Sequence, residues 1–219
     1  MTTFAVLFDM DGVLVDSAPL HVRAYEHIFR EVGLDFPDAA RDAVRSGKAR
    51  SHVLDLALPD AKADLKRKLS VAKPGALKKV LESQADCSVP GATEAVHALA
   101  GASVPMAVVT NSRSPEIWIE KLGISQHIRV VITGDDVSSP KPSAEGYLLG
   151  AERLGVPPNR CLAVEDSHDG WVAARRAGMS VALVADDRPG WLDADTNTMR
   201  RLEAARILHL LEISLATRP

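Results

Sequence analysis

Two acidic pairs, far apart in the chain, are the residues whose types and spacing could do chemistry. Asp9 and Asp11 stand at alternate positions where an apolar run ends, and Glu165 and Asp166 directly follow another apolar run. Carboxylates crowded at the end of a buried strand repel one another and lose solvation unless a cation or a reaction uses them. Hard carboxylate oxygens are the ligands that suit Mg²⁺. The acids therefore indicate a metal site or a site of acid–base chemistry.

Two further polar segments have the chemistry to bind an anion. Thr110 ends a predicted strand and precedes a helix, where hydroxyl and backbone donors suit a phosphate oxygen. A plain helix-capping turn explains Thr110 equally well. Lys141 stands between two prolines, which restrict the backbone and so aim the ammonium group. An exposed loop lysine is the alternative for Lys141.

The elements that must position these residues alternate between strand and helix. Apolar runs predict strands at 4–7, 104–109, 130–132, 161–164 and 181–184, and periodic segments predict helices at 92–100, 114–123, 143–154, 168–177 and 198–214. Continuous apolar strands separated by helices imply a parallel sheet covered on both faces. We therefore expect an α/β fold with a doubly wound, Rossmann-like parallel sheet, whose ligands bind beyond the carboxyl ends of the strands. Each functional segment directly follows a strand, so all four should meet at one edge.

The stretch between the first strand and the rest is helical throughout. Helices are predicted at 18–33, 38–58 and 60–84, with a small basic loop at 47–51. The expected domains are an α/β core made of residues 1–16 and 89–219, and a helical insertion of residues 17–88.

Composition excludes several classes of protein. The 219 residues are 46% hydrophobic and 25% charged with a net charge of −3, so no general attraction to nucleic acid or anionic lipid is expected. Cys87 and Cys161 lack metal-like spacing, and no disulfide is expected. The N-terminus lacks a signal-peptide pattern, and no apolar run approaches the roughly 20 residues that span a bilayer. We expect a cytoplasmic monomer without membrane or nucleic-acid partners.

The four segments, taken in order, resemble the motifs of the haloacid-dehalogenase-like superfamily. They read Asp9-Met10-Asp11-Gly12, Thr110, Lys141 and Glu165-Asp166-Ser167. The position and size of the insertion are similar to those of the phosphatase and β-phosphoglucomutase-like members with a small helical cap. One common pattern of the superfamily has a second acid four residues after Asp166, where this chain has Gly170.

The resemblance implies a Mg²⁺-dependent phosphatase that acts on a small phosphorylated metabolite, expected to be a sugar phosphate. Asp9 would be the nucleophile that becomes an aspartyl-phosphate, and Asp11 would be the general acid and then the base. We expect neighbouring carboxylates and cap closure to raise the pKa of Asp11. Thr110 and Lys141 would bind the transferring phosphoryl oxygens. Mg²⁺ would be held by Asp9, the backbone carbonyl of Asp11, Asp166 and Glu165, directly or through water.

The same resemblance implies a substrate-binding set in and near the cap. Its members would be a cap lysine, Lys73 with Lys68 as the alternative, together with Ser17, His21, Arg50, Asn111, Ser112 and Arg113. A structural histidine at position 21 and a solvated arginine at position 50 are the competing interpretations. His168 is expected to point away from the acids. The tryptophans Trp118, Trp171 and Trp191 are expected to be packing residues in core helices or loops and not stacking platforms for a ligand.

Two other functions remain open at this point. A sugar phosphomutase, an isomerase that passes through a bisphosphate, would use the same residues and would differ in how well the cap excludes water. An inactive phosphate-binding module would keep the fold without the chemistry.

Overall fold

The computed structural model describes residues 4–112 and 115–216, with side chains described as far as residue 213. The chain divides into two compact units. One, the core, consists of Met1–Val15 and Ser88–Pro219, and the other, the helical unit, consists of Asp16–Cys87. These limits differ by one residue from the domain limits expected from the sequence.

The core is built on a fully parallel six-stranded sheet with the order β3-β2-β1-β4-β5-β6. The first strand of the chain is therefore central, and the sheet winds outward from it in both directions, as the alternation of strands and helices predicted. The strands are β1 (Ala5–Phe8), β2 (Met106–Val109), β3 (Val130–Ile132), β4 (Cys161–Glu165), β5 (Ser180–Val184) and β6 (Asn197–Met199).

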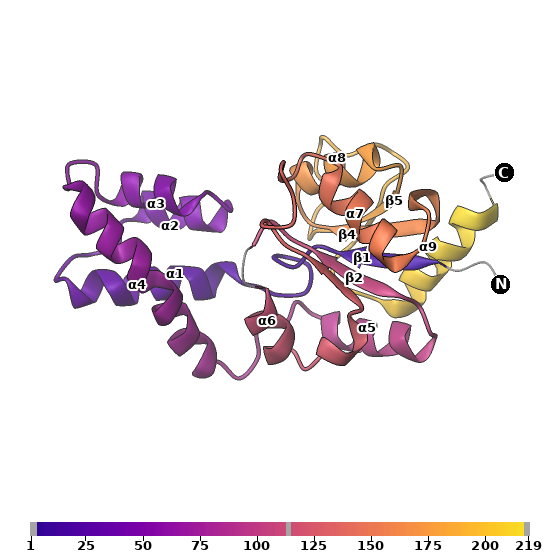
Figure 1. Cartoon of the computed structure of the whole chain (residues 1–219), viewed down its shortest axis with the longest axis horizontal. Helices are drawn as coiled ribbons and strands as arrows, with labels where there is room; N and C mark the ends of the chain where they lie inside the picture. The colour runs from indigo at the N-terminus through magenta and orange to yellow at the C-terminus, as the bar shows by residue number, and fades with distance from the viewer. Residues whose placement is uncertain (1–3, 113–114, 217–219) are drawn as a thin grey trace. The chain divides into compact units, whose positions relative to one another are not determined.

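Helices cover both faces of this sheet. The helices α7 and α8 pack on one face, where α7 contacts β1, β2 and β3 and α8 contacts β4 and β5, while α5 packs against α9. Figure 1 shows α7 and α8 on one side of the strands and α5 on the other. The core helices are α5 (Ala92–Gly101), α6 (Glu116–Lys121), α7 (Glu145–Leu154), α8 (His168–Arg176) and α9 (Ala204–Ala216).

The strands β1 and β2 are apolar at every position, and β4 is apolar up to Glu165, because both faces of these strands are buried. Leu7 and Ala163 belong to the hydrophobic cluster under α7 and α8, which also contains Ala151 and Ala174. All four residues of β1 are fully buried. Strands buried on both faces read as continuous apolar runs, which is the pattern that identified them.

The segment after β5 differs from its prediction. A single helix was expected over 198–214, but the chain first forms β6, in which Thr198 pairs with Leu183, and α9 then begins at Ala204. A three-residue edge strand carries too short an apolar pattern to be distinguished from the start of a helix. The start predicted for α6, at residue 114, lies outside the described residues. Cys87 and Cys161 are buried thiols, and no disulfide joins them.

The helical unit contains α1 (Ala18–Glu31), α2 (Asp38–Arg45), α3 (Arg50–Ala57) and α4 (Ala63–Glu82). The helix-like stretch predicted over 38–58 forms two helices, and the turn between them includes Gly47, whose φ is +66°, within the loop predicted at 47–51. Arg50, expected in a loop, is the first residue of α3. Phe36 packs against Tyr25 and Phe29 at ring distances of 5.1 and 5.0 Å and joins the segment after α1 to its apolar face. Among the described helices, none has the length and hydropathy of a membrane span.

Candidate active site

The carboxyl ends of three adjacent strands bring polar residues to one edge of the sheet. Asp9 follows β1, Thr110 follows β2, and Glu165 is the last residue of β4. The Asp9 backbone N–H donates to the Val164 carbonyl at 2.9 Å, and the Thr110 N–H donates to the Ile132 carbonyl at 2.9 Å. The hydrogen-bond ladder of the sheet thus continues one residue into the site and fixes the backbone of both residues.

Lys141 joins these residues, but from a different place than predicted. It does not directly follow β3; it lies in the loop between β3 and α7, so its reach depends on its long side chain. The Nζ atom donates to Asp9 Oδ1 at 2.6 Å, to Glu165 Oε1 at 2.6 Å and to the Val109 carbonyl at 2.8 Å. Its side chain is only 8% exposed. Lys141 is therefore a buried cation bound between two carboxylates, and an exposed loop lysine is excluded.

Side chains outside the cluster hold the Lys141 loop. The Lys141 N–H donates to Asn111 Oδ1 at 3.2 Å, which ties the loop to the turn after β2. The Glu145 carboxylate accepts hydrogen bonds from the backbone N–H groups of Ser138 and Ser139 at 2.8 and 3.0 Å. These bonds favour the ionised carboxylate and lower the pKa of Glu145. The loop is thus anchored on both sides of Lys141.

Glu165 is completely buried, and both of its oxygens accept hydrogen bonds. Oε1 accepts from Lys141 and from the Tyr147 hydroxyl, each at 2.6 Å. Oε2 accepts from Ser167 Oγ at 3.2 Å and from the Asp166 N–H at 3.3 Å. Sequence reasoning missed Tyr147. The sequence does place a tyrosine on a core-facing position of α7, six residues after Lys141. A buried tyrosine that only packs would show the same pattern, so the sequence does not indicate the contact with Glu165.

Two glycines are required by these carboxylates. A Cβ at Gly170 would lie 1.9 Å from the carboxyl carbon of Glu165 and 2.0 and 2.1 Å from its oxygens. A Cβ at Gly12, whose φ is +80°, would lie 2.0 Å from Asp166 Oδ2. The glycine that departs from the common acidic pattern at position 170 therefore has a physical explanation, since Glu165 occupies the space of its side chain.

The acidic cluster has more carboxylates than the single ammonium group of Lys141 can neutralise. Asp9, Glu165 and Asp166 can place one carboxylate oxygen each within 4.8 Å of the others. Burial raises the pKa of Asp9 well above its usual value, and the nearby Glu165, Asp11 and Asp166 add to this effect while Lys141 opposes it. Burial, followed by Glu165, raises the pKa of Asp166 to about 7. Three carboxylates against one ammonium group leave two negative charges, which a divalent cation would balance. The oxygen-only donor set fits Mg²⁺.

The other predicted core residues lie close to this cluster along the chain. Ser112 donates its backbone N–H to Thr110 Oγ1 at 3.0 Å, so the turn after β2 closes on the threonine hydroxyl. Asn111 is exposed and accepts from the Lys141 loop. Asp11 is half-buried in the turn that follows Asp9. Arg113 lies outside the described residues.

The helical unit gathers most of the predicted cap residues. His21 Nδ1 lies 2.5 Å from Lys73 Nζ, and Lys73 is 6% exposed, whereas Lys68 is exposed on the surface. Lys73, and not Lys68, is therefore the lysine beside the histidine. Burial lowers the pKa of His21 to about 3, with further contributions from Lys73 and Arg50. The neutral ring accepts from Lys73 at Nδ1 and so carries its proton on Nε2.

Ser17 and Arg50 occupy the starts of two helices of the same unit. Ser17 is buried at the N-cap position of α1, and its carbonyl accepts the His21 N–H at 2.9 Å. Arg50 donates through Nη1 to the Ser70 carbonyl at 3.0 Å, which joins α3 to α4.

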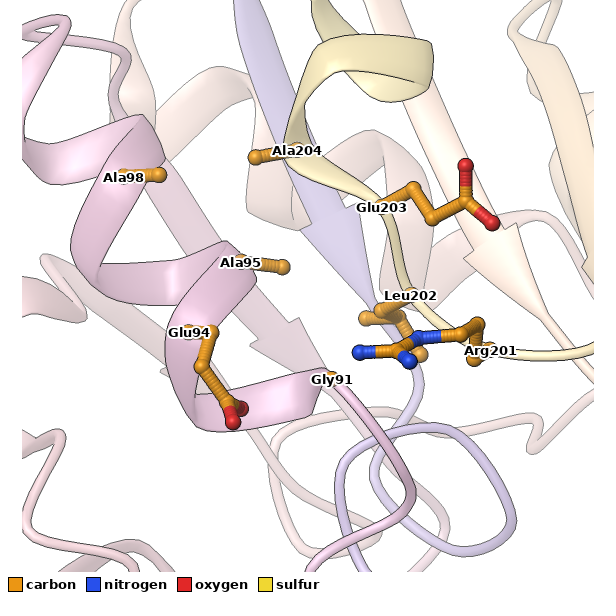
Figure 2. Close-up of a pocket in the computed structure, with 8 residues that line it drawn as sticks. All are labelled: Gly91, Glu94, Ala95, Ala98, Arg201, Leu202, Glu203 and Ala204. Atoms are coloured by element: carbon orange, nitrogen blue, oxygen red, sulfur yellow. The ribbon is translucent and has the colours of Figure 1, made fainter.

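A separate cleft of about 400 Å³ lies between α5 and the residues that lead into α9. Figure 2 shows its lining, which combines small apolar side chains of α5 with Glu94, Arg201 and Glu203. None of its lining residues belongs to the acidic cluster. The chemistry therefore points to the cluster at the sheet edge rather than to this cleft.

Comparison with known proteins agrees with this geometry. The family model of haloacid dehalogenase-like hydrolases matches residues 6–184. The chain is 32% identical over 175 residues to validoxylamine A 7'-phosphate phosphatase of Streptomyces hygroscopicus subsp. limoneus, covering 79% of this chain and 81% of that one. It is 32% identical over 183 residues to the fructose-1-phosphate phosphatase YqaB of Escherichia coli, covering 82% and 95%.

The fold has the same relatives. The crystal structure of β-phosphoglucomutase from Clostridium difficile superposes with a TM-score of 0.75 at 20% identity, covering 98% of this chain and 100% of that one. The sheet order, the place of the helical insertion and the family match all agree. The chain is a member of the haloacid dehalogenase-like hydrolase family.

Proposed function

We propose that this protein is a Mg²⁺-dependent phosphatase that hydrolyses a small sugar phosphate through an aspartyl-phosphate on Asp9. The single observation that carries the proposal is the buried contact of Asp9 with Lys141 inside a cluster of three carboxylates. A buried ion pair contributes little net stability, so a costly cluster of this kind indicates function.

In the first step, an Asp9 carboxylate oxygen attacks phosphorus. A new P–O bond forms to Asp9, and the bond between phosphorus and the sugar oxygen breaks. Asp11 donates its proton to the leaving oxygen, so the sugar departs as an alcohol. Lys141 favours the ionised form of Asp9 at this stage, since the ammonium group lies 2.6 Å from Oδ1 and lowers the pKa of Asp9 against the effect of burial.

In the second step, water releases the phosphate. Asp11, now ionised, takes a proton from the water as its oxygen attacks phosphorus. The P–O bond to Asp9 breaks, and the Asp9 carboxylate is restored. We expect Lys141 and the Thr110 hydroxyl to hold the equatorial phosphoryl oxygens, with Lys141 exchanging one of its three protein acceptors for the phosphate. Donors arranged in this way provide much of the catalysis of phosphoryl transfer.

The carboxylates fit Mg²⁺ as the resident metal. Asp9, Asp166 and the backbone carbonyl of Asp11 would hold it, with Glu165 contributing through water because both of its oxygens already accept protein hydrogen bonds. Bound Mg²⁺ would neutralise the developing charge on the phosphoryl oxygens.

The named relatives support the substrate class. Both phosphatases that share 32% identity with this chain act, by their names, on phosphate esters of sugars or sugar-like molecules. We therefore expect a phosphorylated carbohydrate as substrate, selected by the helical unit of residues 16–87 as a cap.

A panel of phosphorylated sugars and p-nitrophenyl phosphate, with released phosphate as the readout, tests the function. We expect hydrolysis that requires Mg²⁺ and that falls by at least about a thousandfold in Asp9→Asn, since the amide is a poor nucleophile. Equal inactivity of the wild type and Asp9→Asn over the whole panel would contradict the enzymatic proposal.

A second candidate, a sugar phosphomutase, is favoured by the cationic groups of the helical unit. Lys73 and Arg50 both lie near His21, and such groups would hold a second phosphate of a bisphosphate. Incubation with β-glucose 1-phosphate and glucose 1,6-bisphosphate distinguishes the two candidates. Formation of glucose 6-phosphate without free phosphate would establish the mutase, and free phosphate alone would establish the phosphatase.

A further inference from the structure

A cluster of three aromatic rings lies at the surface of the core, close to the acidic site. The His168 and Trp191 rings meet edge to face at 4.9 Å, and Trp171 lies 5.9 Å from Trp191. The three tryptophans were expected to be packing residues, and Trp191 is 39% exposed, whereas Trp118 is 2% exposed. Exposed aromatic groups of this kind mark binding surfaces more often than isolated aliphatic residues do.

The segment that carries Trp191 is fixed by polar contacts on both sides of the ring. Trp171 Nε1 donates to Thr196 Oγ1 at 3.0 Å, and the Thr196 N–H donates to Asp193 Oδ1 at 2.9 Å. Arg188 Nη1 donates to the Thr196 carbonyl at 2.9 Å. Because this backbone is already ordered, a ligand that contacts Trp191 loses little free energy in ordering the protein.

The cluster is within reach of a molecule bound at the acidic site. His168 begins α8 two residues after Asp166, so their Cα atoms lie at most about 7.6 Å apart. The ring centroid of Trp191 lies 4.9 Å from that of His168. A ligand that presents its phosphate to the Asp9–Lys141 pair could therefore extend over the aromatic cluster with roughly one additional sugar ring.

The charges near the cluster select the kind of group that can bind there. The two arginines at the cluster already have protein partners, since Arg175 lies over the Trp171 ring and pairs with Asp193, and Arg188 donates to the Thr196 carbonyl. The first turn of α8 and the segment after β5 carry four further exposed carboxylates, which would repel a second phosphate and accept hydrogen bonds from hydroxyl groups. They are Asp169, Asp186, Asp187 and Asp195. A sugar ring has both an apolar C–H face for the indole and hydroxyl groups for the carboxylates.

We propose that His168, Trp171 and Trp191 form a subsite for an uncharged second sugar ring, so that the substrate is a phosphorylated disaccharide or a molecule of that shape. The inference rests on the proposed phosphatase function and specifies its substrate class. The acidic site binds the phosphate, and the aromatic subsite binds the ring that does not carry it.

Equilibrium binding tests the subsite without turnover. Calorimetric titration of Asp9→Asn with Mg²⁺ present compares glucose 6-phosphate with trehalose 6-phosphate, maltose 6'-phosphate and cellobiose 6'-phosphate, which all present the same phosphorylated ring. At least one disaccharide phosphate should bind about five to ten times more tightly than glucose 6-phosphate, the gain expected from burying part of one indole face. Adding Trp191→Ala should remove that advantage, and Trp191→Phe should keep part of it.

Leu148→Ala is the matched control, because Leu148 is a 44% exposed apolar residue on a different part of the core. It should leave all four dissociation constants within about twofold. Equal affinity for glucose 6-phosphate and every disaccharide phosphate would overturn the subsite, and so would an advantage that survives Trp191→Ala. Hydrolysis of p-nitrophenyl phosphate by the wild type reports the phosphatase function separately, so failure of the subsite and failure of the function give different results.

Discussion

Replacing Gly170 by alanine is the sharpest test of how the acidic cluster is built. In an ordinary helix interior this change stabilises a protein by about 1 kcal/mol, because alanine has the higher helix propensity. Gly170 lies in the first turn of α8, so propensity alone predicts a more stable protein. The structure predicts the opposite, since the new Cβ would lie 1.9 Å from the carboxyl carbon of Glu165.

The magnitude follows from the contacts that Glu165 would lose. No heavy atoms can stay at that separation, so the carboxylate must turn away from Lys141 and Tyr147, from which it accepts hydrogen bonds of 2.6 Å. Each hydrogen bond to a charged group contributes about 1.5–3 kcal/mol. After the gain in propensity, the net destabilisation should be about 2–5 kcal/mol, which at the middle of that range lowers Tm by roughly 7–14 °C.

Thermal unfolding by circular dichroism, together with Mg²⁺-dependent phosphatase assays, measures both consequences. Gly101→Ala is the matched control, because Gly101 is also helical and a Cβ added there would meet nothing within 4 Å. The control should keep or slightly raise Tm and keep full activity. A Gly170→Ala protein with the Tm of the control and wild-type activity would refute the placement of Glu165.

Three further predictions concern the tyrosine, the histidine and the metal. Tyr147→Phe removes one donor from buried Glu165 and should lower the free energy of unfolding by about 1.5–3 kcal/mol in denaturant titrations; no change would contradict the 2.6 Å contact. The pKa of His21 is about 3 in the folded protein and near 6.5 in the unfolded chain, so between these pH values the unfolded chain binds one proton more than the folded protein. The contribution of His21 to stability should therefore be complete above about pH 6.5 and should decline toward pH 3. Lys73→Met should raise that pKa in an NMR titration, and an unchanged value would show that burial and Arg50 lower it without Lys73. Mg²⁺ at a hundred times its dissociation constant should stabilise the folded protein by about 2.7 kcal/mol relative to EDTA, measured as a rise in Tm that NaCl of equal ionic strength does not reproduce.

The sequence predicted the central fold because the signals there are local. Strands buried on both faces show as apolar runs, and the residues that follow them, such as Asp9 and Thr110, were placed at the correct sheet edge by the geometry of parallel sheets alone. Lys141 was assigned to the site correctly in kind but wrongly in position, because its reach depends on a loop whose course no local pattern records.

The residues that sequence reasoning missed act through contacts between distant segments. Tyr147 reaches Glu165 only because α7 packs on the face of the sheet that lies under the acidic cluster. Gly170 appeared as a departure from a motif, and its reason became visible only with the position of the Glu165 carboxylate. Trp191 was expected to be a packing residue, and its partial exposure could not be predicted because the polar contacts that hold its segment involve residues on both α8 and the segment after β5.

The central place of β1 has a consequence for how the chain matures on the ribosome. Val6 pairs with Met106, a hundred residues further along, and Ala5 pairs with Cys161, later still. β1 therefore leaves the exit tunnel before either of its neighbours, and Met106 of β2 follows only a hundred residues after Val6. Meanwhile the intervening helices of residues 16–87, whose contacts are with one another, can form during synthesis. An apolar segment that stays unpaired on the nascent chain is a natural substrate for chaperones, and slowing translation before residue 161 should lengthen its exposure.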